Sequence, residues 1–256
     1  MRYFIYFSYN GTAYHGWQFQ PNAVSVQERM ESAFKTLLRE PVILTAAGRT
    51  DTGVHARLMV AHFDLPDHLQ ADVTDLAFRL NGLLPPDITV HKIVPVQPTA
   101  HARFDATSRT YEYWVTYIKN PYTEHLLTYT RFRLDYDRMN EAAKCLLTEK
   151  DFASFCKAHS DNKTTFCDVR RAFWEEQPMP FMPSQTCHVF TIEADRFLRN
   201  MVRAVVGTLF EVGRGQMTPD EMRDVIHSKS RCAAGQSMPP DGLYLTDIRY
   251  PDHIFS

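Results

Sequence analysis

The stretch Ala47-Gly48-Arg49-Thr50-Asp51-Thr52-Gly53-Val54-His55-Ala56 places one carboxylate in a turn bracketed by two glycines. Glycine allows a close backbone approach that a Cβ would block, and threonine hydroxyls bond the local backbone in turns. The apolar run 42–44 before the turn predicts a strand. Asp51 is then expected at the end of that strand, where a rigid scaffold commonly presents a reactive group.

Two other interpretations fit the same residues. Asp, Thr and Gly are all turn formers, so the stretch is also explained as a purely structural turn. The tripeptide Asp51-Thr52-Gly53 is found in aspartic proteases, which use two aspartates that share a proton. The tripeptide occurs once in this chain, so a second aspartate would have to come from another subunit. Arg49 further disfavours a protease, because a nearby guanidinium keeps the carboxylate ionised.

The longer string from Gly48 to His55 resembles the active-site signature of the tRNA pseudouridine synthase A family. Further motifs of that family follow in the same order over most of the chain. They are Tyr9-x-Gly11-x-x-Tyr14-x-Gly16-Trp17-Gln18 with Ser25-Val26-Gln27-Glu28, His101-Ala102-Arg103-Phe104, Arg109-x-Tyr111-x-Tyr113, Asp151-Phe152-x-Ser154-Phe155, Phe197-Leu198-x-x-Met201-Val202-Arg203-x-x-Val206-Gly207 and Gly242-Leu243-Tyr244-Leu245.

The resemblance implies a fold as well as an activity. Helical and strand patterns alternate in both halves with no low-complexity linker. We therefore expect an α+β protein of two similar lobes that share an extended, mainly antiparallel sheet. The family adds a central active-site cleft and a homodimeric assembly. The predicted lobes are residues 1–105, which carry Asp51, and residues 106–256, which carry Tyr111 and Arg203.

The implied reaction converts uridine to pseudouridine at positions 38, 39 and 40 of the tRNA anticodon stem and loop, without a cofactor or a metal ion. Asp51 is the implied catalytic carboxylate; attack on C1′, attack on C6 and removal of a C2′ proton all stay open. Arg203 is expected to pair with Asp51 and to keep it ionised in a dry site.

Three more residues are expected to bind the substrate. Tyr111 would stack on the extruded uracil or assist a proton transfer. Arg49 would take the place of the extruded base, or alternatively clamp a phosphate. Arg199, one helical turn before Arg203 in a predicted helix over 196–212, would contact the RNA backbone.

Composition permits an RNA substrate without indicating one. The net charge is −2 and the pI is about 6.6, whereas nucleic-acid binders are usually basic. Local charge matters more than the total, and the segment 196–214 contains four arginines against the single acid Glu211. A non-catalytic RNA-binding protein on the same scaffold is the second hypothesis.

The cysteines and histidines predict no metal site. The five cysteines have no C-x-x-C pair, and an odd number without a secretory signal indicates a reducing cytoplasm. His55 and His62 lie in strand-like sequence and are expected to be core or surface residues. No apolar run approaches membrane-spanning length.

Periodicity and capping signals predict the elements. Helices are expected after the capping boxes that begin at Ser25 and Thr218. The other expected helices are 71–83, 137–148 and 196–212, and the expected strands are 2–9, 42–47, 58–65, 88–95, 107–118, 166–176, 186–195 and 243–250.

Overall fold

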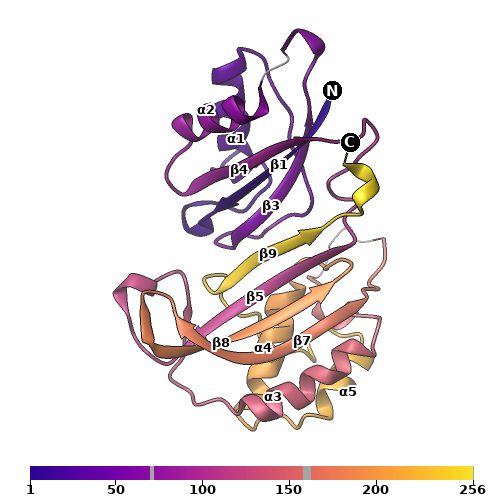
Figure 1. The fold of residues 1–256 in the computed structure, drawn as a ribbon. Helices are drawn as coiled ribbons and strands as arrows, with labels where there is room; N and C mark the ends of the chain where they lie inside the picture. Colours follow the sequence, from indigo (N-terminus) through magenta and orange to yellow (C-terminus); the bar gives the residue numbers. More distant parts are fainter. Residues whose placement is uncertain (70–71, 158–162, 256) are drawn as a thin grey trace. The chain divides into compact units, whose positions relative to one another are not determined.

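A computed structural model describes residues 1–69, 72–157 and 163–255. The chain forms two compact units, shown in Figure 1: Met1–Arg109 together with Tyr244–Ser256, and Thr110–Leu243. The second crossing point differs from a simple division at residues 105 and 106. The C-terminal segment is grouped with the first unit because Tyr244 and Leu245 pair with His55 and Ala56.

The first unit is built on β4 (Ile88–Pro95), β1 (Arg2–Tyr9), β3 (His55–Asp64) and β9 (Leu243–Arg249), in that order. β1 is antiparallel to both β4 and β3, and β9 is parallel to the start of β3. The short β2 (Thr45–Ala46) pairs with the later part of β3. The expected strand 42–47 is therefore reduced to two residues, and Ile43 in its apolar run is 76% exposed.

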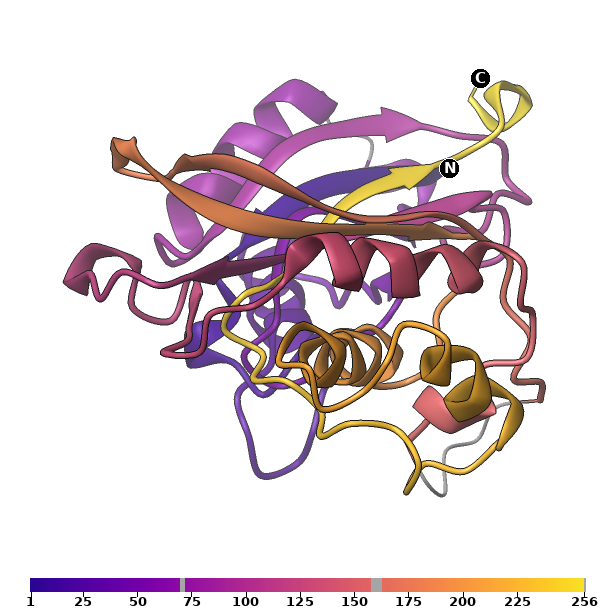
Figure 2. The same ribbon diagram turned by 90° about the horizontal axis from the view of Figure 1, so that it is seen from below.

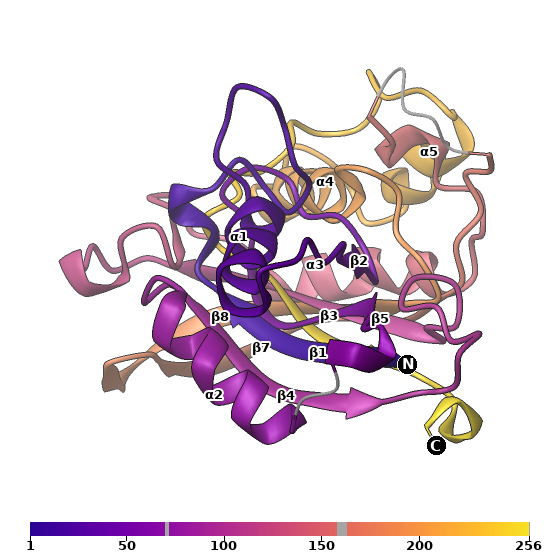
Figure 3. The same cartoon turned by 90° about the horizontal axis from the view of Figure 1, so that it is seen from above.

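The helices of the first unit begin at the predicted signals. α1 (Val26–Leu38) starts after Ser25, whose Oγ accepts the Glu28 backbone N–H at 3.2 Å, as in the predicted capping box. α2 (Val73–Leu83) starts after Asp72 and ends before the prolines at 85 and 86. Residue 71, the first of the predicted helix, lies outside the described residues. Figure 3 shows α2 beside β4, with which it makes contact.

The second unit contains β5 (Ser108–Thr116), β8 (Met182–Ala194) and β7 (Val169–Met179), in that order. β7 and β8 form a long antiparallel hairpin, and the short β6 (Thr128–Tyr129) runs parallel to β5. The predicted strands 166–176 and 186–195 stopped short of the hairpin tip. Prolines in 177–185 read as turn signals, yet an outer ribbon tolerates proline, and Pro178 pairs with Thr186.

The second unit is covered on one side by helices. Figure 2 shows α3 (Tyr136–Ala143) and α4 (Met201–Gly213) on the same side of the β7–β8 ribbon. α4 is buried over nearly its whole circumference and forms the centre of this unit's core. α5 (Glu221–His227) follows Thr218, whose N–H and hydroxyl bond the Glu221 carboxylate at 2.6 and 2.9 Å. This capping box forms as predicted, although the helix begins only at Glu221.

Short 3-10 turns connect these elements. They are η1 (Gly11–Ala13), η2 (Asp67–Leu69), η3 (Pro121–Thr123), η4 (Lys144–Leu147), η5 (Ala153–Phe155) and η6 (Asp252–Ile254). Both units thus combine helices with mainly antiparallel strands, which confirms the predicted α+β class. Within the described residues, no helix is both long and apolar enough to cross a membrane.

Candidate functional site

Asp51 lies in the first unit, in the connection between β2 and β3. Its side chain is half-buried, whereas those of Arg49 and Thr52 are exposed. Gly53 has φ +78°, a left-handed conformation that favours glycine, and the Val54 N–H donates to the Asp51 carbonyl at 3.1 Å. The stretch is therefore a tight turn that holds one partly accessible carboxylate, as its sequence predicts.

The N-terminal motif packs directly against this turn. A Cβ on Gly11 would lie 2.0 Å from the Val54 carbonyl oxygen, and one on Gly16 would lie 2.4 Å from the Thr50 carbonyl oxygen. Only glycine permits these backbone approaches. Two motifs about 40 residues apart in the sequence thus form one structure around Asp51.

Hydrogen bonds hold the two segments together. The Gly53 N–H donates to the Tyr14 carbonyl at 3.2 Å, and the Trp17 N–H donates to the Thr50 carbonyl at 3.3 Å. The Tyr9 hydroxyl and the Thr50 hydroxyl lie 2.8 Å apart and are both buried. These bonds pin the backbone on either side of Asp51, so its position is set by a rigid scaffold. Sequence reasoning missed this role, for which Gly11 and Gly16 were the available signal.

His55 and His62 are core residues, as predicted. Nδ1 of His55 accepts the Gly11 N–H at 3.0 Å, and its ring stacks on Tyr244 with centroids 4.6 Å apart. Nδ1 of His62 accepts the Ala102 N–H at 3.1 Å. The described residues contain no group of three or more potential metal ligands.

Tyr111 and Tyr113 lie on β5 and differ in their surroundings. Tyr113 is fully buried; its hydroxyl donates to the Pro239 carbonyl at 2.9 Å and lies 2.6 Å from the Thr128 hydroxyl. Tyr111 is only partly buried and meets Phe197 edge-on, with ring centroids 5.1 Å apart. Tyr113 is thus a core residue, and Tyr111 is the tyrosine of this pair with a surface left for a ligand.

Arg203 lies in the first turn of α4 and is partly buried. Its Nε donates to the Met238 carbonyl at 2.6 Å, and the Met238 N–H donates back to the Arg203 carbonyl at 3.1 Å. The side chain is therefore oriented by a neighbouring loop and does not simply cover the apolar edge of the helix. Such orientation suits a guanidinium that must meet a carboxylate in one geometry.

Arg231 holds this loop in place. Its guanidinium donates to the carbonyls of Ala234 and Gly235 at 3.2 and 3.0 Å and to the Ser237 hydroxyl at 2.7 Å. Asn200 Nδ2 donates to the same hydroxyl at 2.6 Å. No feature of the sequence singled out Arg231, because its role depends on a loop that folds back on α4.

The predicted helical stripe of Arg199 and Arg203 is wrong. Asn200 adopts φ +68°, so α4 begins at Met201 and Arg199 lies in the preceding turn. Arg199 is exposed, and its carbonyl accepts the Lys157 N–H at 3.1 Å. Among the arginines in 196–214, Arg203 is the one inside the helix, and Arg214 follows the helix end.

The site residues are distributed over both units. Arg49 and Asp51 share one loop of the first unit, and Tyr111, Arg199 and Arg203 belong to the second. Within the second unit, Phe197 connects the neighbourhood of α4 to Tyr111. Each unit therefore supplies a different part of the predicted machinery.

Comparison with known proteins agrees with these motifs. The family model described as tRNA pseudouridine synthase matches residues 142–251. The tRNA pseudouridine synthase A of Parabacteroides distasonis is 53% identical over 254 residues, which are 99% of this chain and 98% of the relative. That of Bacteroides thetaiotaomicron is 53% identical over 255 residues, covering 100% and 93%, and that of Porphyromonas gingivalis is 52% identical over 255 residues, covering 99% of each.

Such identity over the full length confirms the predicted family, and with it the predicted fold and enzyme class. The chain belongs to the tRNA pseudouridine synthase A family.

Proposed function

We propose that the chain isomerises uridine to pseudouridine at positions 38, 39 and 40 of the tRNA anticodon stem and loop, with Asp51 as its essential carboxylate. The observation that carries this proposal is the Asp51 turn itself. Its carboxylate is partly accessible, and its backbone is pinned by Tyr14 and Trp17. Full-length relatives with the same family name support the substrate.

The reaction needs few groups. The N1–C1′ bond breaks, the uracil turns, C5 bonds to C1′, N1 gains a proton and C5 loses one. The base must first leave its stack, because its edge and the sugar carbon are otherwise shielded. A carboxylate serves as nucleophile or base in such a reaction, and no redox step or external co-reactant is required. The proposal includes no cofactor and no metal.

The other residues have supporting roles. Arg203 pairs with Asp51 and keeps it ionised against the cost of desolvation. The accessible ring of Tyr111 stacks on the uracil, supported from its edge by Phe197. Arg49, exposed and two residues before Asp51, replaces the extruded base or binds a phosphate. Arg199 contacts the RNA backbone from its turn, not from a helix face.

The proposed setting is that of the family. The enzyme acts in the cytoplasm as a homodimer on the anticodon stem-loop of tRNA. Sedimentation of the purified protein at micromolar concentration tests the dimer, for which a single species of the monomer mass of 29.7 kDa would be the contrary result.

The function is tested by tritium release from tRNA transcripts labelled at uridine C5, because C5 loses its hydrogen when it bonds to C1′. Transcripts with uridine at only one of positions 38, 39 and 40 identify the sites. Wild type should release tritium and Asp51→Asn should not. Asp220→Asn is a matched control, because the Asp220 side chain makes no capping bond at α5.

Each other outcome changes the proposal in a defined way. Release by Asp51→Asn would remove Asp51 from the reaction centre. No release by wild type, with tRNA binding retained, would favour a non-catalytic RNA-binding protein.

A further inference from the structure

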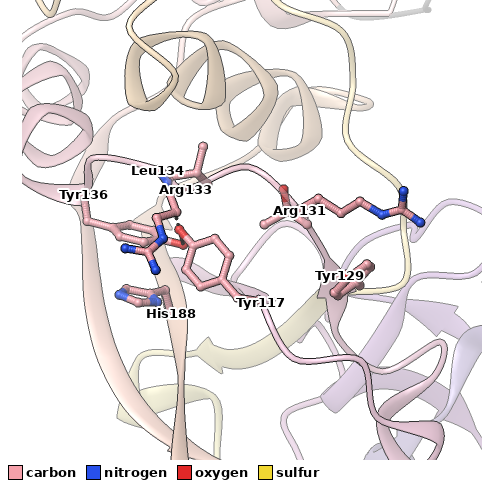
Figure 4. A pocket seen from close by; sticks show the side chains of 8 residues that line it. Tyr117, Tyr129, Arg131, Arg133, Leu134, Tyr136 and His188 are labelled. Carbon is pink, nitrogen blue, oxygen red and sulfur yellow. Dashed lines mark hydrogen bonds between the residues drawn. The ribbon is translucent and has the colours of Figure 1, made fainter.

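An open pocket of about 470 Å³ lies on the second unit, away from Tyr111 and Arg203 in its list of lining residues. Strands β5, β6 and β8 and the segment that leads into α3 contribute to it, as shown in Figure 4. Its volume falls in the range of small-ligand sites, about 300–1,000 Å³. The lining residues are Tyr117, Tyr129, Thr130, Arg131, Arg133, Leu134, Tyr136 and His188.

One wall of the pocket is aromatic and rigid. The rings of Tyr136 and His188 stack with centroids 3.6 Å apart and an interplanar angle of 2°. Tyr117 meets both rings edge-on, its hydroxyl donates to the Tyr136 hydroxyl at 3.2 Å, and it accepts the Leu134 N–H at 2.9 Å. Tyr129, 45% exposed, adds a further ring. Such surfaces stack on the faces of nucleic-acid bases, whatever the base.

Two cations accompany this wall. Arg131 and Arg133 are both exposed, and within the described residues neither has a hydrogen-bond, ion-pair or ring partner for its guanidinium. The nearby acids are engaged elsewhere: Asp135 accepts the Arg138 backbone N–H at 3.0 Å, and Glu176 is bonded by the Thr186 hydroxyl. An unpaired guanidinium is well suited to bind a phosphate through two parallel bonds.

The pocket also contains an unsatisfied polar atom. Nδ1 of His188 is buried and has no hydrogen-bond partner within the described residues. Such atoms are rare in folded proteins, because the lost hydration is normally replaced. Its neighbours Arg214 and Phe132, in contrast, satisfy each other through a cation–π contact of 4.2 Å.

We propose that this pocket binds one nucleotide of an RNA strand, with the base on the tyrosine–histidine wall and the phosphate on Arg131 and Arg133. Nothing in the uridine isomerisation requires this site, and it would add affinity for the tRNA at a distance from the reacting uridine in the sequence of lining residues. The inference rests on the proposed function for the identity of the RNA, but its test does not depend on catalysis.

The test measures the Kd of an unmodified tRNA transcript by filter binding, in the Asp51→Asn background so that no turnover occurs. Arg131→Gln with Arg133→Gln should weaken binding about tenfold or more, because charge-assisted bonds to a phosphate are lost. The slope of log Kd against log salt should fall by about 1. Arg131→Lys with Arg133→Lys should restore part of the affinity, because lysine binds phosphate as a point charge.

Matched controls separate the pocket from general charge. Lys144→Gln with Arg223→Gln removes two cations that are already ion-paired elsewhere in this unit, and it should change the Kd less than twofold. Tyr129→Leu removes a ring of the pocket and should weaken binding about five- to a hundredfold. Tyr122→Leu removes a tyrosine that is 76% exposed outside the pocket and should have no effect.

The two proposals fail in different ways. Equal Kd values for wild type and the pocket variants, or equal losses in the control pair, would overturn the nucleotide site while tritium release still supports the function. Weaker binding by the pocket variants, with no tritium release by the protein carrying Asp51, would keep the site and overturn the isomerase.

Discussion

The loop that orients Arg203 is held against α4 by a contact that only glycine allows. A Cβ on Gly207 would lie 1.8 Å from the Gln236 carbonyl oxygen, whereas ordinary van der Waals contact begins at 3.4 Å. Gly207→Ala therefore forces the loop away by about 1.6 Å, the difference between these distances. The helix itself cannot yield, because it is buried in the core of the second unit.

The cost follows from the bonds that this movement breaks. They are Gly235 N–H to the Thr208 hydroxyl at 2.9 Å, Met238 N–H to the Arg203 carbonyl at 3.1 Å, and Arg203 Nε to the Met238 carbonyl at 2.6 Å. At about 0.5–1.5 kcal/mol each, they sum to roughly 2–4 kcal/mol. The better helix propensity of alanine returns up to about 1 kcal/mol, so we expect a net loss of about 1–3 kcal/mol.

Urea unfolding followed by circular dichroism measures this loss, and Gly82→Ala in α2 is the matched control. No atom lies within 4 Å of a Cβ at position 82, so that variant should keep or gain up to about 1 kcal/mol. Gly207→Ala should also lose tritium release, because Arg203 is no longer held by Met238. Equal unfolding free energies for the two alanine variants would refute the steric argument.

Three further predictions concern single residues. Arg231→Lys keeps the charge but cannot bond both the Gly235 carbonyl and the Ser237 hydroxyl; kcat should fall more than tenfold with tRNA KM nearly unchanged, and an equal rise in KM would instead indicate RNA contact. Tyr111→Phe should retain tRNA binding and lose turnover, and full activity would limit Tyr111 to stacking. Burial, aided by the charge of His101, lowers the pKa of His62 to about 4. The unfolded chain then binds the extra proton between pH 6.5 and 4, so the unfolding free energy should fall as pH falls through that window; an NMR titration of His62 with a midpoint near 6.5 would contradict this.

Local signals in the sequence were sufficient for much of the fold. The Ser25 capping box places the start of α1, and the alternation over 2–9 and 88–95 gives β1 and β4 with their bounds. The family motifs also identified Asp51, Tyr111 and Arg203 as candidates. These features are readable because the interactions that define them lie within a few residues of one another.

Other features depend on partners far away in the chain. The left-handed Asn200 shortens α4 and removes Arg199 from it, although the local pattern 196–212 is helical. The hairpin of β7 and β8 continues past its prolines because an outer ribbon does not need every backbone N–H.

The sequence by itself determined the family, the enzyme class and the residues that carry the chemistry, since these are encoded in short strings. Tertiary structure alone decided how those residues are held. It brought Gly11 and Gly16 against the Asp51 turn and the loop fastened by Arg231 against Gly207. The physical reason is that close backbone contact is set by the packing of distant segments, and a glycine in a sequence does not name the segment that will cover it.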